Sequence, residues 1–239
     1  MKAVAVVLAS GSGERFGSMD LPKHLTPIRH IPIVCWTINT ILKSELFSAL
    51  VVVSSSNNFL ATNNCIKEYF TGNKTPILFA KGSTERSESF NLGFDVLLDQ
   101  DLVNKNSIVS LFDANRPFVS IAQLSKLHDI VQDNECACPA RPVVNGVALS
   151  SGGKINSVPD KSHFVEFVTP EFLNLGAFRC ELKNFLRGHN CFVEFAISFG
   201  FYPITIESTK YNTKLTYPED KSYMEGLVVN NNLCLPLKC

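Results

Sequence analysis

The sequence has no excess of charge of either sign and no long apolar run. Its 239 residues include 22 basic and 22 acidic side chains, so the formal net charge is zero. Binding to nucleic acid or to an anionic membrane depends on a surplus of lysine and arginine, which this chain lacks. No segment approaches the ~18 apolar residues of a membrane-spanning helix. These absences argue against nucleic acid and membrane as partners and leave open a local basic site for a small phosphate.

Linkers, repeats and paired metal-binding cysteines are also missing. No Gly/Ser-rich or Pro-rich stretch interrupts the chain, which predicts one domain over residues 1–239. The eight cysteines are scattered, and Cys136 and Cys138 stand closer than a zinc CxxC pair, with no second pair. The apolar start at residues 3–8 is short and runs into a glycine-rich loop rather than a cleavage site. We therefore expect a cytoplasmic protein whose cysteines act as small apolar residues.

What the sequence does contain is an alternation of buried strands and amphipathic helices. Continuous apolar runs rich in β-branched residues predict strands, and apolar residues at helical spacing predict helices. The expected order is strand 3–8, helix 31–42, strand 50–54, helix 57–70, strand 76–80, helix 87–98 and strand 107–112. This order predicts an α/β fold, a Rossmann-like, mostly parallel sheet flanked by helices on both faces. Ligands bind at the carboxyl ends of such strands, where residues 9–23 and 113–117 lie.

The second half of the chain has a different pattern. Residues 139–159 carry turn signals at Asn145-Gly146 and at 151–153, and Asn-Gly between apolar runs predicts a hairpin. Pro170 predicts the start of a helix, and residues 199–206 read as a late strand. A final helix is expected from Pro218, with acidic residues at the positive end of its dipole.

The loop after the first strand has the composition of a phosphate-binding loop. It reads Ala9-Ser10-Gly11-Ser12-Gly13-Glu14-Arg15-Phe16-Gly17. Backbone N–H groups can converge on an anion where glycine removes Cβ, and Arg15 and Lys23 can neutralise a triphosphate. A Rossmann loop needs a third glycine where Phe16 stands, and the Gly-Lys-Ser/Thr of a P-loop is absent. The two glycines on their own favour an ordinary strand-to-helix connection that carries surface bases.

Six separated blocks decide between these readings, because their order and spacing resemble the methylerythritol phosphate and ribitol-5-phosphate cytidylyltransferase family. The resemblance runs from Ala3 to Glu225 and implies a nucleotidyltransferase fold related to that of GT-A glycosyltransferases. It also implies transfer of CMP from CTP to a small polyol phosphate, with release of pyrophosphate. The blocks are the glycine-rich loop with Arg15, Pro22-Lys23, residues 82–89, Asp113-Ala114-Asn115-Arg116-Pro117, residues 169–172 and residues 214–220.

The resemblance also implies roles for individual residues. The implied catalytic residues are Arg15, Lys23, Lys161 and Lys214. The implied nucleotide-binding residues are Ala9, Ser10, Gly11, Gly13, Gly82, Arg86, Ser89, Asp113 and Ala114. The implied acceptor-binding residues are Asp113, Arg116, Arg141, Thr169 and Lys214, with Asp113 also placed near a catalytic Mg²⁺. The acceptor phosphate is already anionic near neutral pH, so these groups would act by positioning and by electrostatic stabilisation. Mg²⁺ would bridge phosphate oxygens and keep several waters, so it requires few protein carboxylates.

The acceptor half departs from the family's pattern at two places. The family's Arg-Asp-Thr corresponds to Arg141-Pro142-Val143, and its later Thr-Asp-Glu-Ala corresponds to Phe192-Val193-Glu194-Phe195. We infer a more apolar acceptor pocket, so a specialised polyol phosphate for capsule or wall polymers stands beside the isoprenoid intermediate methylerythritol phosphate. In the family, the region of residues 139–159 is a β-arm that clasps a second subunit and helps complete its active site. We therefore expect a protruding β-arm and a homodimer.

Two other functions remain open at this point. A glycosyltransferase of related architecture would use an Asp-x-Asp metal motif, which Asp113-Ala114-Asn115 narrowly misses. A nucleotide-binding module that lost turnover would bind CTP without forming a product. Release of pyrophosphate from CTP distinguishes the cytidylyltransferase from both.

Overall fold

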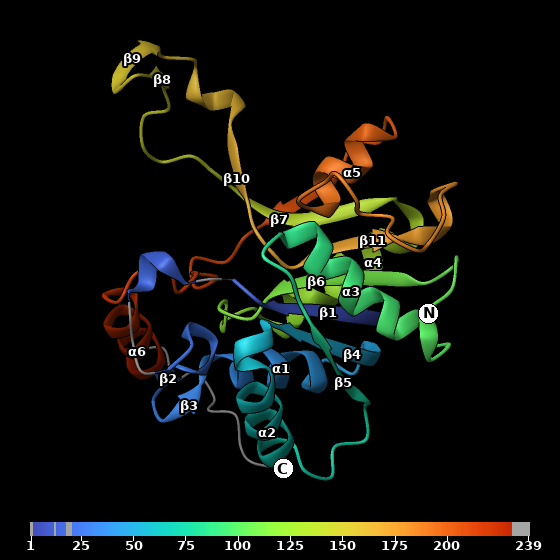
Figure 1. Ribbon diagram of the computed structural model, residues 1–239. Coiled ribbons are helices and arrows are strands. Elements are labelled where there is room, and N and C mark those ends of the chain that lie inside the picture. Colours follow the sequence, from blue (N-terminus) through green and yellow to red (C-terminus); the bar gives the residue numbers. More distant parts are fainter. Residues whose placement is uncertain (1, 12, 18–20, 231–239) are drawn as a thin grey trace.

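The computed structural model describes residues 2–11, 13–17 and 21–230. Ser12, residues 18–20, Cys234 and Cys239 lie outside the described residues. In the described part of the chain, the largest sheet has eight strands, in the order β10-β7-β11-β6-β1-β4-β5, with β12 paired to β7 (Figure 1). Their bounds are β1 (Ala3–Ala9), β4 (Phe47–Ser54), β5 (Ile77–Lys81), β6 (Ile108–Asp113), β7 (Cys136–Pro142), β10 (Val165–Phe167), β11 (Glu171–Asn174) and β12 (Ile204–Glu207).

The four strands expected from the first half of the sequence form a parallel block, β6-β1-β4-β5, that reaches one edge of this sheet. β1 lies between β4 and β6, with Val6 opposite Val51 on one side and Leu111 on the other. All seven residues of β1 are buried, because helices cover both faces. The predicted mostly parallel sheet is therefore confirmed. Leu8 is opposite Asp113, so the glycine-rich loop and the loop after β6 leave the sheet side by side.

Helices cover the sheet in two layers, each with its own core. The side chains of β1 alternate between the layers, so that Val7 joins one core and Val6 the other. The first core includes residues of α1 (Ile33–Lys43), α2 (Phe59–Tyr69), α4 (Ile121–Asp133) and α6 (Asp220–Asn230). The second core includes residues of α3 (Arg86–Asp99) and α5 (Phe192–Ser198). None of the helices in the described residues is long and apolar enough to cross a membrane.

The segment after Pro170 is a strand, so the predicted helix at this position is wrong. β11 pairs antiparallel with β6, where Phe172 is opposite Ser110, and with β7, where Leu173 is opposite Cys136. Phe172 packs in the first core and Leu173 in the second, and neither side chain is exposed. A proline at a helix start is a local signal, and burial of both faces between two strands outweighs it. The sequence patterns also did not predict α4 or α5.

The region predicted as an arm contains a small hairpin outside the main sheet. β8 (Leu149–Ser151) and β9 (Lys154–Ser157) pair only with each other, and all their residues are exposed. Figure 1 shows this hairpin well away from the sheet. Its turn lies at Gly152-Gly153, with φ of 58° and 74°, which glycine adopts readily. Two expectations need correction: residues 139–142 belong to β7, and Asn145-Gly146 lies between β7 and β8 rather than in a hairpin turn.

Several cysteines contribute to the buried interior as small apolar residues, as expected. Cys136, Cys138 and Cys191 are buried free thiols, and Cys180 is a half-buried one. Burial raises the pKa of all four, to about 12 for Cys138 and Cys191. The remaining short strands, β2 (Pro27–Ile28) and β3 (Ile31–Pro32), pair with each other ahead of α1.

Candidate active site

A cavity of about 450 Å³ opens at the carboxyl ends of β1 and β6. This is the edge of a parallel sheet at which ligands bind. Four chain segments far apart in the sequence line it: the loop after β1 with the turn that follows, the loop before α3, the loop after β6 and the segment before α6. The lining residues are Leu8, Ala9, Ser10, Gly11, Gly13, Glu14, Arg15, Lys23, His24, Thr84, Arg86, Asp113, Ala114, Asn115 and Lys214.

Gly13 and a buried phenylalanine shape the described part of the glycine-rich loop. Gly13 has φ of 72°, a conformation that favours glycine. A short 3-10 helix follows at Glu14–Phe16, where Phe16 N–H donates to Gly13 O at 2.7 Å. The Phe16 side chain is 2% exposed and packs in the first core, so it anchors the turn to the core. Arg15, the residue before this anchor, lines the cavity.

A second loop packs tightly behind the wall of the cavity. A Cβ at position 82 would come within 2.9 Å of Ser10, Ser89 and Val53, so this close approach requires Gly82. The Ser89 hydroxyl accepts from Ser10 Oγ at 2.9 Å and from Ser83 N–H at 3.0 Å, and it donates to Ser83 O. Ser89 is fully buried and does not line the cavity. Its side chain therefore joins the glycine-rich loop to the loop before α3.

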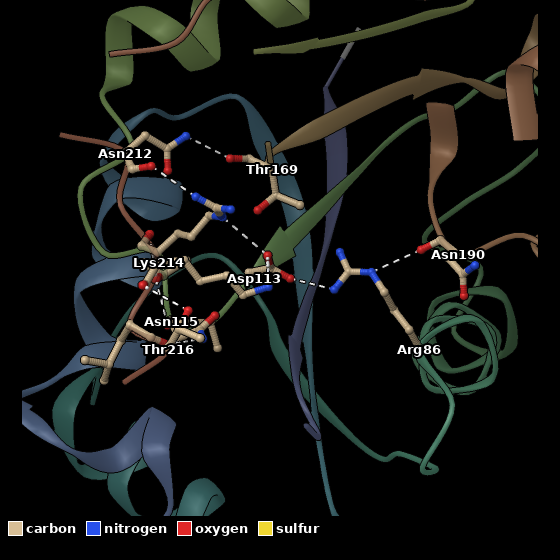
Figure 2. Close-up of polar contacts among 12 residues, drawn as sticks. Arg86, Asp113, Asn115, Thr169, Asn190, Asn212, Lys214 and Thr216 are labelled. Carbon is tan, nitrogen blue, oxygen red and sulfur yellow. Dashed lines mark hydrogen bonds and ion pairs between the residues drawn. The ribbon is translucent and has the colours of Figure 1, made fainter. Parts of the chain in front are cut away.

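Asp113 is the centre of the charges in the site. Its Oδ1 accepts from Arg86 Nη1 at 2.7 Å, and its Oδ2 is 2.9 Å from Lys214 Nζ and 3.4 Å from Arg116 Nε. Figure 2 shows Asp113 between Arg86 on one side and Lys214 on the other. Arg86 Nε also donates to Asn190 O at 3.0 Å, next to the start of α5. One carboxylate thus joins three cations from three separate segments.

The pKa shifts in the cavity follow from this surplus of positive charge. Burial alone would raise the pKa of Asp113, but Arg86, Lys214 and Arg116 hold it well below its usual range. Burial and the nearby charges of Lys214 and Arg15 lower the pKa of Lys23. Repulsion between these cations is relieved when an anion enters, which is the electrostatic character of a phosphate site.

His24 is a neutral part of the wall. Burial and the adjacent Lys23 lower its pKa to about 4. Its Nε2 lies 2.7 Å from Thr62 Oγ1, and Thr62 donates its own proton to Asn58 O at 2.7 Å. Thr62 is thus left to accept the proton of His24 Nε2. This contact ties the turn at Lys23–Leu25 to α2.

The loop after β6 is held from two sides. Thr37 on α1 donates its hydroxyl to Ala114 O at 3.1 Å and to Arg116 O at 3.3 Å. On the other side, the Asn115 side chain donates to Leu215 O at 2.7 Å. Neither Thr37 nor Asn115 has a role in the site that was predicted from the sequence. Asn115 stood inside a recognised block, but its partner lies 100 residues away and no local pattern reveals it.

The predicted acceptor residues Arg116 and Thr169 come together beside Asp113. Arg116 Nη1 donates to Asn212 O at 3.0 Å. Asn212 Nδ2 donates to Thr169 O at 2.9 Å, and Figure 2 shows this contact. The Thr169 hydroxyl and the Asn212 side-chain oxygen are buried without a hydrogen-bond partner in the described part of the chain. The neighbourhood of Arg116 therefore holds polar atoms of the kind that polyol hydroxyls bind.

Six predicted residues do not line this cavity: Gly82, Ser89, Arg116, Thr169, Lys161 and Arg141. Lys161 is exposed and donates to Val144 O at 3.0 Å. Arg141 pairs with Glu166 at 2.7 Å and lines a separate cavity together with Lys210. The cavity of the same chain therefore brings together Arg15, Lys23 and Lys214, but not Lys161 or Arg141.

Glu171 is a buried carboxylate next to the site, and no role was predicted for it from the sequence. Its Oε2 accepts from Phe192 N–H at 2.7 Å and from Val193 N–H at 3.2 Å, at the start of α5. Burial raises its pKa to about 7, against the opposing effects of Arg86 and these two N–H groups. No signal in the sequence marks Glu171 as buried, because the segment after Pro170 was predicted to be a helix and its pairing with β6 and β7 is not visible in its own residues.

We expect Glu171→Gln to stabilise the protein at high pH and to leave its stability unchanged at low pH. The pKa of Glu171 is higher in the folded state than in the unfolded state, so wild-type stability falls as pH rises from about 4.5 to about 7. A shift of this size corresponds to about 3 kcal/mol, and glutamine avoids it because it carries no charge. Urea denaturation at several pH values measures the effect. Glu194→Gln is the control, because Glu194 also accepts a backbone N–H near α5 but is exposed. Equal pH dependence of the wild type and Glu171→Gln would contradict the expectation.

The cavity offers few side chains that could bind a metal ion. The described residues contain no group of three or more His, Cys, Asp or Glu side chains that could hold a metal. Asp113 has one hydrogen bond to Oδ1 and two cationic contacts to Oδ2. A carboxylate has about four lone-pair sites, so Oδ1 keeps one for a further ligand.

Comparison with known proteins places this chain in a family. The family model of 2-C-methyl-D-erythritol 4-phosphate cytidylyltransferase (IspD) matches residues 3–229. A ribitol-5-phosphate cytidylyltransferase of Lactiplantibacillus plantarum is 23% identical over 231 residues, covering 94% of this chain and 97% of the relative. A 2-C-methyl-D-erythritol 4-phosphate cytidylyltransferase of Haemophilus ducreyi is 27% identical over 233 residues, covering 96% and 97%.

Solved structures agree on the fold. A crystal structure of 4-diphosphocytidyl-2C-methyl-D-erythritol synthase superposes with a TM-score of 0.77 at 21% identity, covering 95% of this chain and 99% of that one. The enzyme from Francisella tularensis gives a TM-score of 0.72 at 22% identity, covering 93% and 98%. The chain therefore belongs to the 2-C-methyl-D-erythritol 4-phosphate cytidylyltransferase (IspD) family of nucleotidyltransferases.

Proposed function

We propose that this chain transfers CMP from CTP to a small polyol phosphate, forming a CDP-polyol and pyrophosphate. One observation carries the proposal: Asp113 gathers Arg86, Arg116 and Lys214 at a cavity that also presents Arg15 and Lys23 beside a glycine-rich loop. A nucleoside triphosphate and a second phosphate bring many negative charges into one small volume. Such a density of cations suits a reaction between two phosphates.

The chemistry needs positioning more than proton transfer. An oxygen of the acceptor phosphate attacks the α-phosphorus of CTP, and the bond from that phosphorus to its bridging oxygen breaks. The electron pair of this bond leaves with pyrophosphate. The attacking oxygen is already ionised near neutral pH, so no general base is required. Arg15 and Lys23 would hold the triphosphate, while Lys214 and Arg116 would hold the acceptor phosphate, which offsets the repulsion between the two anions.

A magnesium ion is part of this proposal. Its ligands would be triphosphate oxygens and the open site on Asp113 Oδ1. Mg²⁺ keeps several waters and is typically bound through one or two carboxylates together with substrate phosphates, so a single aspartate is compatible with it. When bound, the ion would neutralise charge on the phosphate oxygens.

The acceptor is either 2-C-methyl-D-erythritol 4-phosphate or ribitol 5-phosphate, the compounds named in the two relatives. Pro142 and Val143 stand where the family's pattern has Asp and Thr, which favours an acceptor with altered hydroxyl contacts over strict use of methylerythritol phosphate. Position 115 is an asparagine whose Nδ2 donates to Leu215 O, so the second carboxylate of the glycosyltransferase Asp-x-Asp motif is missing.

A homodimer completes the proposal. Lys161 and Arg141 lie outside the cavity of their own chain, at and beyond the base of the exposed β8–β9 hairpin. In a dimer held together by residues 139–159, Lys161 and Arg141 would lie at the cavity of the second copy. Sedimentation equilibrium measures the mass of the assembly. A monomer with full turnover would rule the arrangement out.

A pyrophosphate-release assay tests the function. With Mg²⁺ and CTP, the wild type should release pyrophosphate in the presence of ribitol 5-phosphate or 2-C-methyl-D-erythritol 4-phosphate. Replacement of CTP by ATP, GTP or UTP, or of the acceptor by glucose 1-phosphate, should reduce the rate strongly. CTP binding without pyrophosphate release for every acceptor would favour an inactive nucleotide-binding module, and the proposed reaction would be rejected.

A further inference from the structure

Lys214 lies on a segment that is neither helix nor strand. β12 ends at Glu207 and α6 begins at Asp220, and Lys214 lies between them. Its side chain is 34% exposed and reaches Asp113 Oδ2 at 2.9 Å. A partly exposed lysine loses considerable rotamer entropy when it is held in one place. Its placement therefore depends on what fixes the backbone beside it.

Asn115 fixes the residue that follows Lys214. Leu215 N–H donates to Asn115 O at 2.9 Å, and Asn115 Nδ2 donates to Leu215 O at 2.7 Å. Both backbone polar groups of Leu215 are thus held by one residue. Asn115 is 7% exposed and Leu215 is fully buried, so water does not compete for these bonds. Figure 2 shows Asn115 next to Lys214 and Asp113.

The contact between Asn115 and Leu215 lies close in sequence to both partners of the Asp113–Lys214 ion pair. Asn115 lies two residues after Asp113, and Leu215 lies one residue after Lys214. On either side of Leu215 the segment has further attachments: Asn212 O accepts from Arg116 at 3.0 Å, and Thr216 N–H donates to Asp220 Oδ2 at 2.7 Å. Together with the bond from Arg116 to Asn212 O, the two bonds to Asn115 hold this segment against the loop after β6, and the Asn115 bonds are the ones adjacent to Lys214 in the sequence.

We propose that Asn115 is a positioning residue: it holds the backbone beside Lys214 so that the Lys214 side chain can bind the acceptor phosphate. This inference rests on the proposed function. The amide is required because Leu215 O needs a donor. Aspartate at position 115 would place a carboxylate against that carbonyl oxygen and a second negative charge beside Lys214. Alanine would keep the backbone bond from Leu215 N–H and leave Leu215 O without its side-chain donor.

Kinetics of Asn115→Ala test the proposal. We expect the KM for the acceptor that the wild type uses, ribitol 5-phosphate or 2-C-methyl-D-erythritol 4-phosphate, to rise about tenfold, as for loss of one buried hydrogen-bond partner. CTP affinity, measured without acceptor, should change less than about twofold by the same reasoning, because Lys214 grips the acceptor. Asn115→Asp should be more severe than Asn115→Ala. Asn134→Ala is the control, since Asn134 also donates its amide to a backbone carbonyl, Ile130 O at 2.8 Å, but lies outside the site.

A double-mutant cycle separates positioning from direct contact with substrate. In a Lys214→Met background, the further change Asn115→Ala should alter the KM for the acceptor by less than about twofold, because coupled residues are not additive. A full tenfold effect in that background would overturn the proposal, since Asn115 would then act on the substrate itself.

Hydrogen exchange provides a measurement that needs no substrate. Amides of residues 212–217 should exchange faster in Asn115→Ala than in the wild type, and at the wild-type rate in Asn134→Ala. Unchanged exchange in Asn115→Ala would overturn the proposal whatever the kinetics. If the wild type released no pyrophosphate with either acceptor, the proposed function would fail, and the exchange comparison would still decide whether Asn115 holds this segment.

Discussion

Asp113→Asn is expected to destabilise the protein by about 3–5 kcal/mol, the cost of breaking a buried ion pair by removing one partner. Asp113 is 7% exposed in its side chain and faces Arg86, Arg116 and Lys214. Asparagine would leave these three cations close together without a balancing charge. Turnover should fall at least about a hundredfold, because the same carboxylate orients the groups around the reacting phosphates. Urea denaturation and pyrophosphate release measure the two effects.

Glu166→Gln is a matched control for the stability effect. The Arg141–Glu166 pair has the same 2.7 Å distance as Arg86–Asp113, but its side chains are 40% and 56% exposed. Its loss should cost less than about 1 kcal/mol, as for exposed ion pairs generally. Equal losses of stability in the two variants would show that burial is not the cause of the large stability effect expected for Asp113→Asn.

The stability difference between the wild type and Asp113→Asn should also depend on pH in a defined way. The pKa of Asp113 is held well below its usual range, so the folded state favours the ionised form. The contribution of Asp113 is therefore fully present above the pKa of an unfolded aspartate, about 4, and is lost as pH falls below it. A difference that disappeared between about pH 5 and pH 8 would contradict the pairing, because Asp113 stays ionised there.

Lys23→Ala is expected to lower turnover by about a hundred- to a thousandfold, the range seen when one stabilising donor is removed from a transition state. Lys23 follows Pro22 at the start of a 3-10 turn and lines the cavity with Arg15 and Lys214. CTP affinity should also fall, since the triphosphate loses one cationic partner. Calorimetric titration with CTP and the pyrophosphate assay separate the two effects.

The stability of Lys23→Ala should not fall, in contrast to Asp113→Asn. Burial and the charges of Lys214 and Arg15 lower the pKa of Lys23, so its protonated form is held at a cost in the folded protein. Removing that charge leaves the free energy of unfolding equal or higher. Lys126→Ala removes an exposed lysine of α4 and controls for loss of a positive charge elsewhere. Near-normal turnover in Lys23→Ala would remove Lys23 from the mechanism.

The centre of the fold could be predicted from the sequence because its signals are local. Most residues of β1, β4 and β6 are apolar and many are β-branched, which is typical of short strands covered on both faces. Gly13 and the basic residues after it stand directly behind such a strand, so their place at its carboxyl end follows from the chain itself.

The rest of the site depends on contacts between distant segments. The strand at Glu171 was misread because a proline before it imitates a helix start, and its pairing with β6 and β7 leaves no trace in its own residues. The contact of Asn115 with Leu215 spans 100 residues, so spacing patterns do not reveal it. Lys161 and Arg141 were assigned by resemblance, and their position outside the cavity of their own chain is visible only in three dimensions.

The buried thiols can serve as an intrinsic probe of unfolding. Alkylating reagents attack the thiolate, and burial raises the pKa of Cys138 and Cys191 to about 12 and that of Cys136 well above normal. At neutral pH these three positions stay unlabelled while the fold is closed and become modified once it opens. Peptide-resolved mass spectrometry after brief exposure to iodoacetamide would therefore rank variants by how often they unfold, without any attached dye.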